Sequence, residues 1–173
     1  MPDGPAPLEG RAGWSRAWQE PAFRRNAILT LLVLATAVVV QARFLVWNES
    51  RSGTALEDPL LELFQPRDFS ILTFALIWIA IALSAWRLVR LPHLLLHACR
   101  GYGLLAFSRV TLMYLVPLDP PETIIPLRDP LVEVFSTGAD PLTRDLFFSG
   151  HTATLLLLHL VLPAGWLKRA LLM

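Results

Sequence analysis

The sequence predicts an all-α fold, a polytopic membrane helix bundle with four transmembrane helices. Three observations predict this fold class. First, 54% of the 173 residues are hydrophobic and the mean hydropathy is +0.51, which is unusual for a soluble domain. Second, four apolar segments approach the roughly 20 residues that one helix needs to cross a bilayer. Third, basic and acidic connections alternate between these segments. A buried helix of a soluble protein would explain one such segment but not four.

The four predicted spans are residues 27–47, 69–88, 101–118 and 147–167. The third contains Arg109, and its sequence also allows an earlier start, near His93. Together the four spans predict one transmembrane domain over residues 27–173.

Residues 1–26 are rich in Pro, Gly and Arg and are predicted to form a cytoplasmic tail. They lack the short apolar core and the small-residue cleavage site of a signal peptide. Trp14 and Trp18 stand four positions apart, which fits one face of a short interfacial helix, although plain disorder explains the spacing equally well.

The charges of the connections predict the orientation, because basic residues next to a span stay on the cytoplasmic side. The basic regions contain Arg11, Arg16, Arg24 and Arg25, then Arg87, Arg90 and Arg100, then Lys168 and Arg169. The acidic regions contain Glu49, Glu57, Asp58, Glu62 and Asp68, then Asp119, Glu122, Asp129, Glu133, Asp140 and Asp145. We therefore expect a cytoplasmic N-terminus. Since 14 arginines stand against one lysine, a bias typical of GC-rich bacterial coding, the expected location is a bacterial inner membrane.

A histidine begins the fourth predicted span, in the run Asp-Leu-Phe-Phe-Ser-Gly-His-Thr at residues 145–152. An ionisable group at the edge of the hydrocarbon region loses hydration, so it usually has a function. A helix start also offers unpaired backbone N–H groups and the positive end of the helix dipole to an anion. The run therefore predicts a phosphate-like ligand, with His151 near the outer, periplasmic face.

Residues 145–152, read as Asp-x3-Ser-Gly-His-Thr, resemble the signature of the sphingomyelin synthases, a branch of the type 2 phosphatidic acid phosphatase superfamily. Thr143 and Arg144 stand where that family has Cys-Gly. Upstream, Arg109 and the later Pro117 resemble its Tyr-x2-Arg segment and the proline that follows. The Lys-x6-Arg-Pro motif of lipid phosphatases is absent from the sequence, which favours the synthase-like branch.

The resemblance implies transfer of a phosphoryl-bearing head group through a covalent phosphohistidine. The implied substrate is a phospholipid or sphingolipid in the bilayer, and the acceptor is water or a lipid alcohol. His151 matches the histidine that handles the proton of the hydroxyl group. Asp145 is the second candidate catalytic residue, which hydrogen-bonds His151 or braces Arg144. No cofactor, metal or nucleic-acid partner is expected.

Four further residues are candidates for substrate binding. Arg109 either binds phosphate through its guanidinium fork or forms an internal ion pair with Asp119, Asp145 or a backbone carbonyl. Ser149 and Thr152 cap the helix or donate to phosphate, and capping is the favoured role for Ser149. Gly150 permits a close approach of the backbone.

Four other side chains have the chemistry of metal ligands but are interpreted as structural. His93 and His97 stand one helical turn apart beside Cys99, a spacing that suits either a metal or a pair of interfacial histidines. Because no carboxylate accompanies them, we favour the second interpretation. His159 is expected to pack against a neighbouring helix.

The second motif of the resembled family, His-Tyr-Thr-x-Asp, is absent from these residues. The resemblance implies that it supplies the nucleophilic histidine and that the full architecture has six helices. We therefore expect a truncated enzyme whose C-terminal part is missing. The alternative is a catalytically inactive protein that binds lipid or forms subunits, or one that is completed by another copy or a second subunit. A transporter is a weaker third alternative, because the sequence shows no internal repeat.

Overall fold

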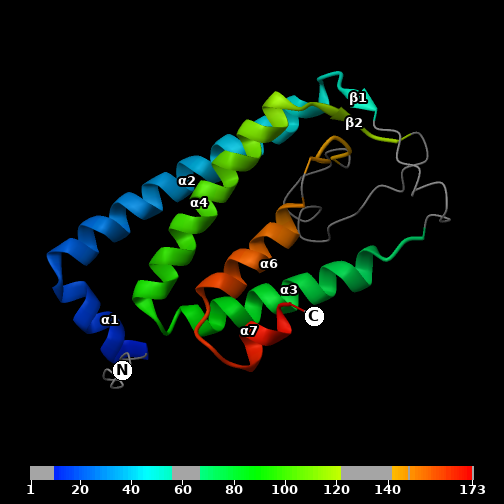
Figure 1. Cartoon of the computed structure of the whole chain (residues 1–173). Coiled ribbons are helices and arrows are strands. Elements are labelled where there is room, and N and C mark those ends of the chain that lie inside the picture. Colours follow the sequence, from blue (N-terminus) through cyan, green and yellow to red (C-terminus); the bar gives the residue numbers. More distant parts are fainter. Residues whose placement is uncertain (1–9, 56–66, 122–141, 148, 173) are drawn as a thin grey trace.

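The computed structural model describes residues 10–55, 67–121, 142–147 and 149–172 (Figure 1). These residues form a mainly helical fold with one pair of two-residue strands. The elements are α1 (Gly10–Gln19), α2 (Pro21–Glu49), β1 (Thr54–Ala55), α3 (Ser70–Leu88), α4 (Pro92–Leu115), β2 (Leu118–Asp119), α6 (Gly150–Val161) and α7 (Trp166–Ala170). The predicted helical fold class is thus confirmed for the described part of the chain.

Two helices, α2 and α3, are long and apolar enough to cross a membrane by length and composition. Only 17% of the most apolar window of each helix is buried, whereas the core helix of a soluble protein is mostly buried. Their outward faces carry large apolar side chains, including Ile28, Leu32, Val39, Ile71, Leu72 and Ile79. This exposure suits a surrounding of lipid better than one of water.

The fourth predicted span is wrong in length. In place of one helix over 147–167, α6 has 12 residues, which is about 18 Å and much shorter than the ~30 Å hydrocarbon core. The cause is Pro163, which cannot donate a backbone hydrogen bond and disfavours helical geometry at the residue before it. Leu162 is accordingly extended, with ψ of 140°, and the short α7 begins only at Trp166.

The helices at the other three predicted spans differ from the predicted bounds mainly at their ends, and of these three only α2 and α3 are long and apolar enough to cross a membrane. The helix expected over 69–88 is confirmed to within one residue by α3. The span 27–47 belongs to the longer α2, which starts at Pro21, and the span 101–118 belongs to α4, which starts at Pro92. Both prolines occupy the first helical turn, where a fixed φ angle favours helix initiation. The predicted tail, 1–26, is helical from Gly10 onward within the described residues.

Helix α4 lies at the centre of the fold. It packs parallel along α2 and contacts α3 and α6 on its other side (Figure 1). At the α4–α6 contact, a Cβ atom added to Gly101 would lie 2.5 Å from Cδ1 of Leu157, so the two helices approach closely there. The position of α4 between the other helices brings its polar side chains against several elements.

The two ends of the bundle differ in composition. The basic end comprises α1, the start of α2, the α3–α4 turn and α7, and it carries Arg16, Arg24, Arg25, Arg87, Arg90, Lys168 and Arg169. The strand end comprises the ends of α2 and α4 and the parallel pair β1–β2, in which Thr54 is opposite Leu118. This grouping follows the predicted alternation of charge. Of the acidic residues in that prediction, Glu57, Asp58, Glu62, Glu122, Asp129, Glu133 and Asp140 lie outside the described residues.

Candidate functional site

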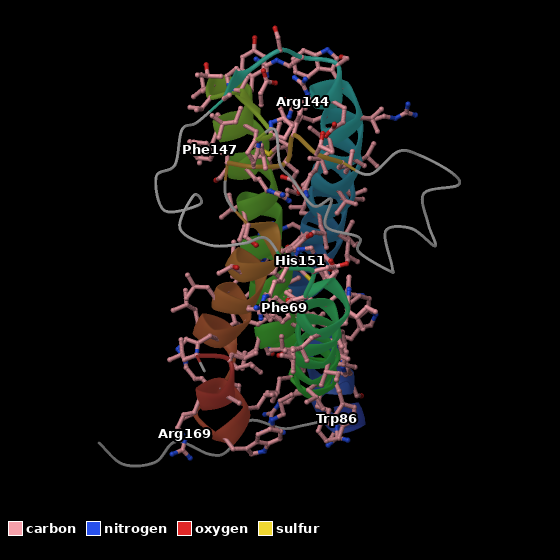
Figure 2. All side chains as sticks on the ribbon, turned by 90° about the vertical axis from the view of Figure 1, so that its right-hand side faces the viewer. Phe69, Trp86, Arg144, Phe147, His151 and Arg169 are labelled. Atoms are coloured by element: carbon pink, nitrogen blue, oxygen red, sulfur yellow. The ribbon has the colours of Figure 1, made fainter. Side chains whose placement is uncertain are left out.

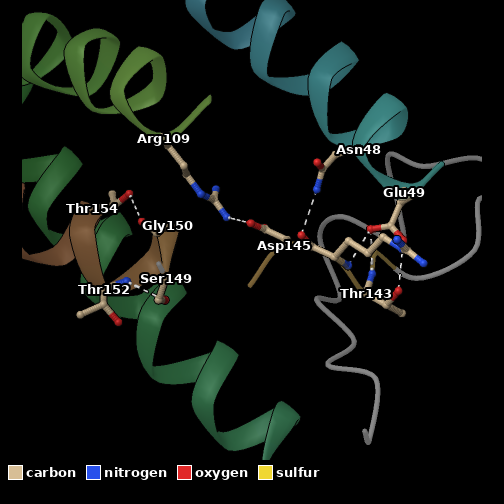
Figure 3. Close-up of polar contacts among 10 residues, drawn as sticks. Asn48, Glu49, Arg109, Thr143, Asp145, Ser149, Gly150, Thr152 and Thr154 are labelled. Atoms are coloured by element: carbon tan, nitrogen blue, oxygen red, sulfur yellow. Dashed lines mark hydrogen bonds and ion pairs between the residues drawn. The ribbon is translucent and has the colours of Figure 1, made fainter. Parts of the chain in front are cut away.

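An ion pair joins the middle of the bundle to the motif-bearing segment. Arg109 on α4 is 7% exposed, and its Nη2 donates a hydrogen bond to Oδ1 of Asp145 (Figure 3). The side chain of Asp145 retains 26% exposure. Of the alternatives for Arg109, an internal ion pair with Asp145 is therefore what the structure shows.

The guanidinium group of Arg109 also lies directly against the first residue of α6. A Cβ atom added to Gly150 would stand 2.8 Å from Cζ of Arg109, so the guanidinium group would have to shift away from the helix start. Glycine at this position is what allows the cation and the helix start to meet. The expected close approach at Gly150 is thus present, with a guanidinium as the approaching group.

The start of α6 is capped by its own residues. Oγ of Ser149 accepts a hydrogen bond from the backbone N–H of Thr152 at 3.3 Å, the usual geometry of an N-cap serine. Oγ1 of Thr154 donates to the carbonyl of Gly150 at 2.7 Å. Ser149 therefore has the capping position that the sequence favours, and Thr152 takes part through its backbone, with an exposed side chain.

The imidazole of His151 packs between two aromatic rings of α3. Its ring centroid lies 5.2 Å from that of Phe74 and 6.3 Å from that of Trp78, both in edge-on geometry. Sequence reasoning did not identify either ring, although two aromatics four positions apart define one face of a helix. These contacts hold His151 at the start of α6, directly after Gly150, the residue that the Arg109 guanidinium contacts.

The site is recessed from the strand end. Arg109 precedes Leu115, the last residue of α4, by six positions, which is about 9 Å along a helix. Figure 2 shows His151 between the ends of the molecule, with Arg144 at one end and Trp86 and Arg169 at the other.

A second carboxylate, which sequence reasoning missed as a site residue, holds the segment before Asp145. Oε1 of Glu49, the last residue of α2, accepts hydrogen bonds from the backbone N–H groups of Thr143 and Arg144 at 2.9 and 2.8 Å. Oε2 of Glu49 accepts from Oγ1 of Thr143 at 3.1 Å, and Nδ2 of Asn48 donates to the carbonyl of Arg144 at 3.0 Å (Figure 3). A carboxylate at the negative end of a helix dipole is unfavourable. Its position at the end of a predicted helix was the feature of the sequence that could have indicated a compensating contact.

The side chain of Arg144 pairs with a different carboxylate from that of Arg109. Its Nη1 forms an ion pair with Oδ1 of Asp119 on β2. The hydrogen bond from Arg144 is the largest cause that lowers the pKa of Asp119, and a backbone hydrogen bond from Gly53 lowers that pKa further, while desolvation opposes both. Asp145 therefore does not need to brace Arg144, because Asp119 does so.

The remaining histidines make structural contacts near the basic end. Nδ1 of His97 donates to the carbonyl of His93 at 2.7 Å, and the His93 ring lies 5.0 Å from that of Phe23. Nδ1 of His159 donates to the carbonyl of Lys168 at 2.7 Å, which joins α6 to α7. Within the described ranges, no three His, Cys, Asp or Glu side chains are grouped as metal ligands would be.

No protein-family model matches the chain, and neither a curated protein nor a solved structure is significantly similar to it. The chemistry of the site therefore has to be argued from its own geometry.

Proposed function

We propose that this chain is an integral membrane protein that binds the phosphate of a phospholipid or sphingolipid head group between Arg109 and the start of α6. His151 then transfers a proton during head-group transfer or hydrolysis. One observation carries the proposal: the Arg109 guanidinium contacts both Asp145 and Gly150, although Arg109 and Asp145 are 36 positions apart in the sequence. The segment with Arg109 and the motif at 145–152 each resemble a part of the sphingomyelin synthases, and they meet in space.

The geometry suits a phosphate in three respects. The guanidinium group matches phosphate oxygens through its planar fork of donors. The start of α6 adds backbone N–H groups and the positive end of its dipole. His151 lies next to Gly150, where an imidazole can give a proton to the leaving alkoxide or take one from the entering hydroxyl group. A phosphate bound here would share the guanidinium group with Asp145, whose carboxylate holds it beside the start of α6.

In this proposal the nucleophilic histidine comes from outside the residues described here. A downstream extension of the chain, another copy of it or a second subunit would supply that histidine. The basic end faces the cytoplasm of a bacterium and the recessed site opens toward the periplasmic face, in keeping with the charge distribution.

A second candidate function is a catalytically inactive protein that binds lipid or forms subunits. One observation favours it, namely that the Asp145 carboxylate already occupies the guanidinium group where a phosphate would bind. The two candidates share the membrane location and differ in turnover, so they can be separated by one experiment.

The test is head-group release or transfer from labelled phospholipids. It compares the 173-residue chain with a version extended through any downstream reading frame, each with and without His151→Ala. General acid–base catalysis contributes about 10²- to 10⁴-fold, so we expect a loss of that size on His151→Ala. His97→Ala, which removes an exposed histidine near the basic end, is the matched control and should leave turnover unchanged. Turnover that survives His151→Ala would refute the assigned role.

A further inference from the structure

We propose that Glu49 is a positioning residue of the site, whose carboxylate fixes residues 143–144 so that Asp145 reaches Arg109. This inference rests on the function proposed above. Glu49 does not touch the start of α6, and it acts through the backbone that leads to Asp145.

The contacts of Glu49 leave the segment little freedom. One carboxylate receives the N–H groups of two consecutive residues and the hydroxyl group of Thr143, at 2.8 to 3.1 Å. Asn48, which is 3% exposed, binds the carbonyl of Arg144 from the same helix end. Since consecutive Cα atoms are about 3.8 Å apart, a fixed Arg144 confines Asp145 to a small volume.

Both anchors of Asp145 belong to helices packed against each other. Glu49 ends α2, and Arg109 lies on α4, which runs parallel along α2. The α2–α4 packing therefore sets the distance between the group that holds Arg144 and the cation that holds Asp145. A second carboxylate, Asp119, holds the Arg144 side chain from β2. The segment is thus tied to two elements at the strand end before it descends to Arg109.

The placement of Glu49 also costs free energy that its contacts must offset. A negative charge in the last turn of a helix opposes the helix dipole, and no basic residue stands in the last turn of α2. Hydrogen bonds from backbone N–H groups to a carboxylate are among the strong ones in proteins. A glutamate with only a surface role would gain nothing from this position.

The first experiment measures hydrogen exchange of the Thr143 and Arg144 amides, which needs no activity. We expect Glu49→Ala to accelerate exchange at these two amides by about tenfold or more, since each loses a charge-assisted hydrogen bond. Glu49→Gln should preserve most of the protection, because its amide oxygen still accepts. Glu20→Ala is the matched control, since Glu20 stands exposed at the other end of α2 without a side-chain capping bond. Unchanged exchange in Glu49→Ala would overturn the inference.

The second experiment is a double-mutant cycle on head-group turnover. A displacement of about 1 Å at a reacting group can cost about 100-fold, so Glu49→Ala should lower turnover by a factor between ten and that value. In an Asp145→Ala background, Glu49→Ala should cause no further loss, because the residue that it positions is gone. Independent, multiplying losses would show that Glu49 supports only the stability of the fold, and would overturn the inference.

Thr143→Val tests the same contact with less risk to folding, because it removes only the hydroxyl donor to Glu49. It should lower turnover, but by less than Glu49→Ala does. If Thr143→Val, Glu49→Gln and Glu49→Ala all kept wild-type turnover, Glu49 would not be a positioning residue. A wild-type chain without turnover in any form would refute the proposed function, while the exchange measurement would still decide whether Glu49 holds the segment.

Discussion

The two ends of the bundle are held by different kinds of contact. At the strand end, charged side chains pair across elements that are far apart in the sequence, as in Glu49 with Thr143 and Arg144 with Asp119. The strand end also has an aromatic contact, in which Arg51 lies over the rings of Trp47 and Tyr114 at 4.8 and 5.2 Å. At the basic end, aromatic rings and backbone carbonyls make the contacts between elements, without such charge pairs among the contacts described. The ring centroids of Trp14, Trp18 and Phe23 lie 5.9 to 6.5 Å apart, and Nε1 of Trp14 donates to the carbonyl of Val89 at 2.7 Å.

This difference indicates a division of labour. Aromatic side chains beside basic ones are typical of a membrane interface, where they anchor helix ends, and the Arg90 guanidinium stacks 4.0 Å from the centroid of Trp86 in this way. Directional hydrogen bonds to carboxylates instead fix a chain segment in one geometry. Both ends carry aromatic and basic contacts of this kind, and the strand end adds the hydrogen bonds that hold residues 143–144. Changes at Trp14 and at Glu49 should therefore have separable effects.

The largest expected effect is that of Asp145→Ala. It removes the carboxylate from an arginine that is 7% exposed, and breaking a buried pair in this way costs up to about 3–5 kcal/mol. We expect a lower melting temperature in detergent, partly restored by millimolar inorganic phosphate, because phosphate can take the place of the carboxylate. Asp119→Ala, at the more exposed pair, should melt closer to the wild type. If Asp145→Ala and Asp119→Ala lowered the melting temperature equally in the absence of phosphate, the two ion pairs would not differ in their contribution to stability.

Gly150→Ala should have the next largest effect. The added Cβ atom overlaps the Arg109 guanidinium, which must move away from the start of α6. Overpacking of this kind costs about 1–3 kcal/mol, and here it should also weaken phosphate binding. Thr152→Ala is the control, because the exposed Thr152 side chain can be removed while its backbone N–H still donates to Ser149. Binding of inorganic phosphate, measured by calorimetry, should fall in the first variant alone.

A smaller effect is expected from Trp14→Phe at the basic end. The substitution keeps an aromatic ring but removes the donor to the Val89 carbonyl, and such a hydrogen bond is worth about 0.5–1.5 kcal/mol. The melting temperature should fall slightly, and head-group turnover and phosphate affinity should stay at wild-type values. A loss of turnover that matches that of Glu49→Ala would show that the two ends are not separable.

The smallest expected effect is the pH dependence contributed by Asp119. Its pKa in the folded protein lies below the ordinary value of 3.8, so the folded state binds fewer protons than the unfolded state when both titrate. The stabilisation is therefore complete above the ordinary pKa and is lost as the pH falls through the lowered one. Melting temperatures of wild type and Asp119→Asn between pH 6 and pH 3 should converge at the acidic end. A gap that widens as the pH falls would reverse the sign of this contribution.

Part of the fold could be predicted from the sequence because its signals are local. The apolar run of α3, the prolines that open α2 and α4, and the serine that caps α6 each act within a few positions. The break after α6 was also visible, since Pro163 interrupts the predicted span, but the apolar composition around it outweighed the proline. The sequence left a short helix in the predicted tail open beside disorder, because the apolar side of that helix, with Trp14 and Ala17, is completed by Phe23 and Leu96 from other helices.

The site was only partly predictable for the same reason. The motif at 145–152 and Arg109 were found from residue types, and the ion pair between Arg109 and Asp145 was one of several alternatives. The role of Glu49 could not be predicted, because its contact with Thr143 spans 94 positions and depends on how α2 packs along α4. Long-range contacts of this kind are decided by tertiary packing.

The most direct test of the central claim compares two arginines of α4. We would measure the affinity of the detergent-solubilised chain for a short-chain phosphatidic acid with Arg109→Ala, Arg109→Lys and Arg100→Ala. Arg100 is exposed, and its Nε donates a hydrogen bond to Oγ1 of Thr30 at 3.0 Å, away from the start of α6. Loss of a charge-assisted bond should weaken binding about 10- to 100-fold in Arg109→Ala, less in Arg109→Lys, and leave Arg100→Ala at wild-type affinity. Equal affinity in the Arg109 and Arg100 variants would contradict the account.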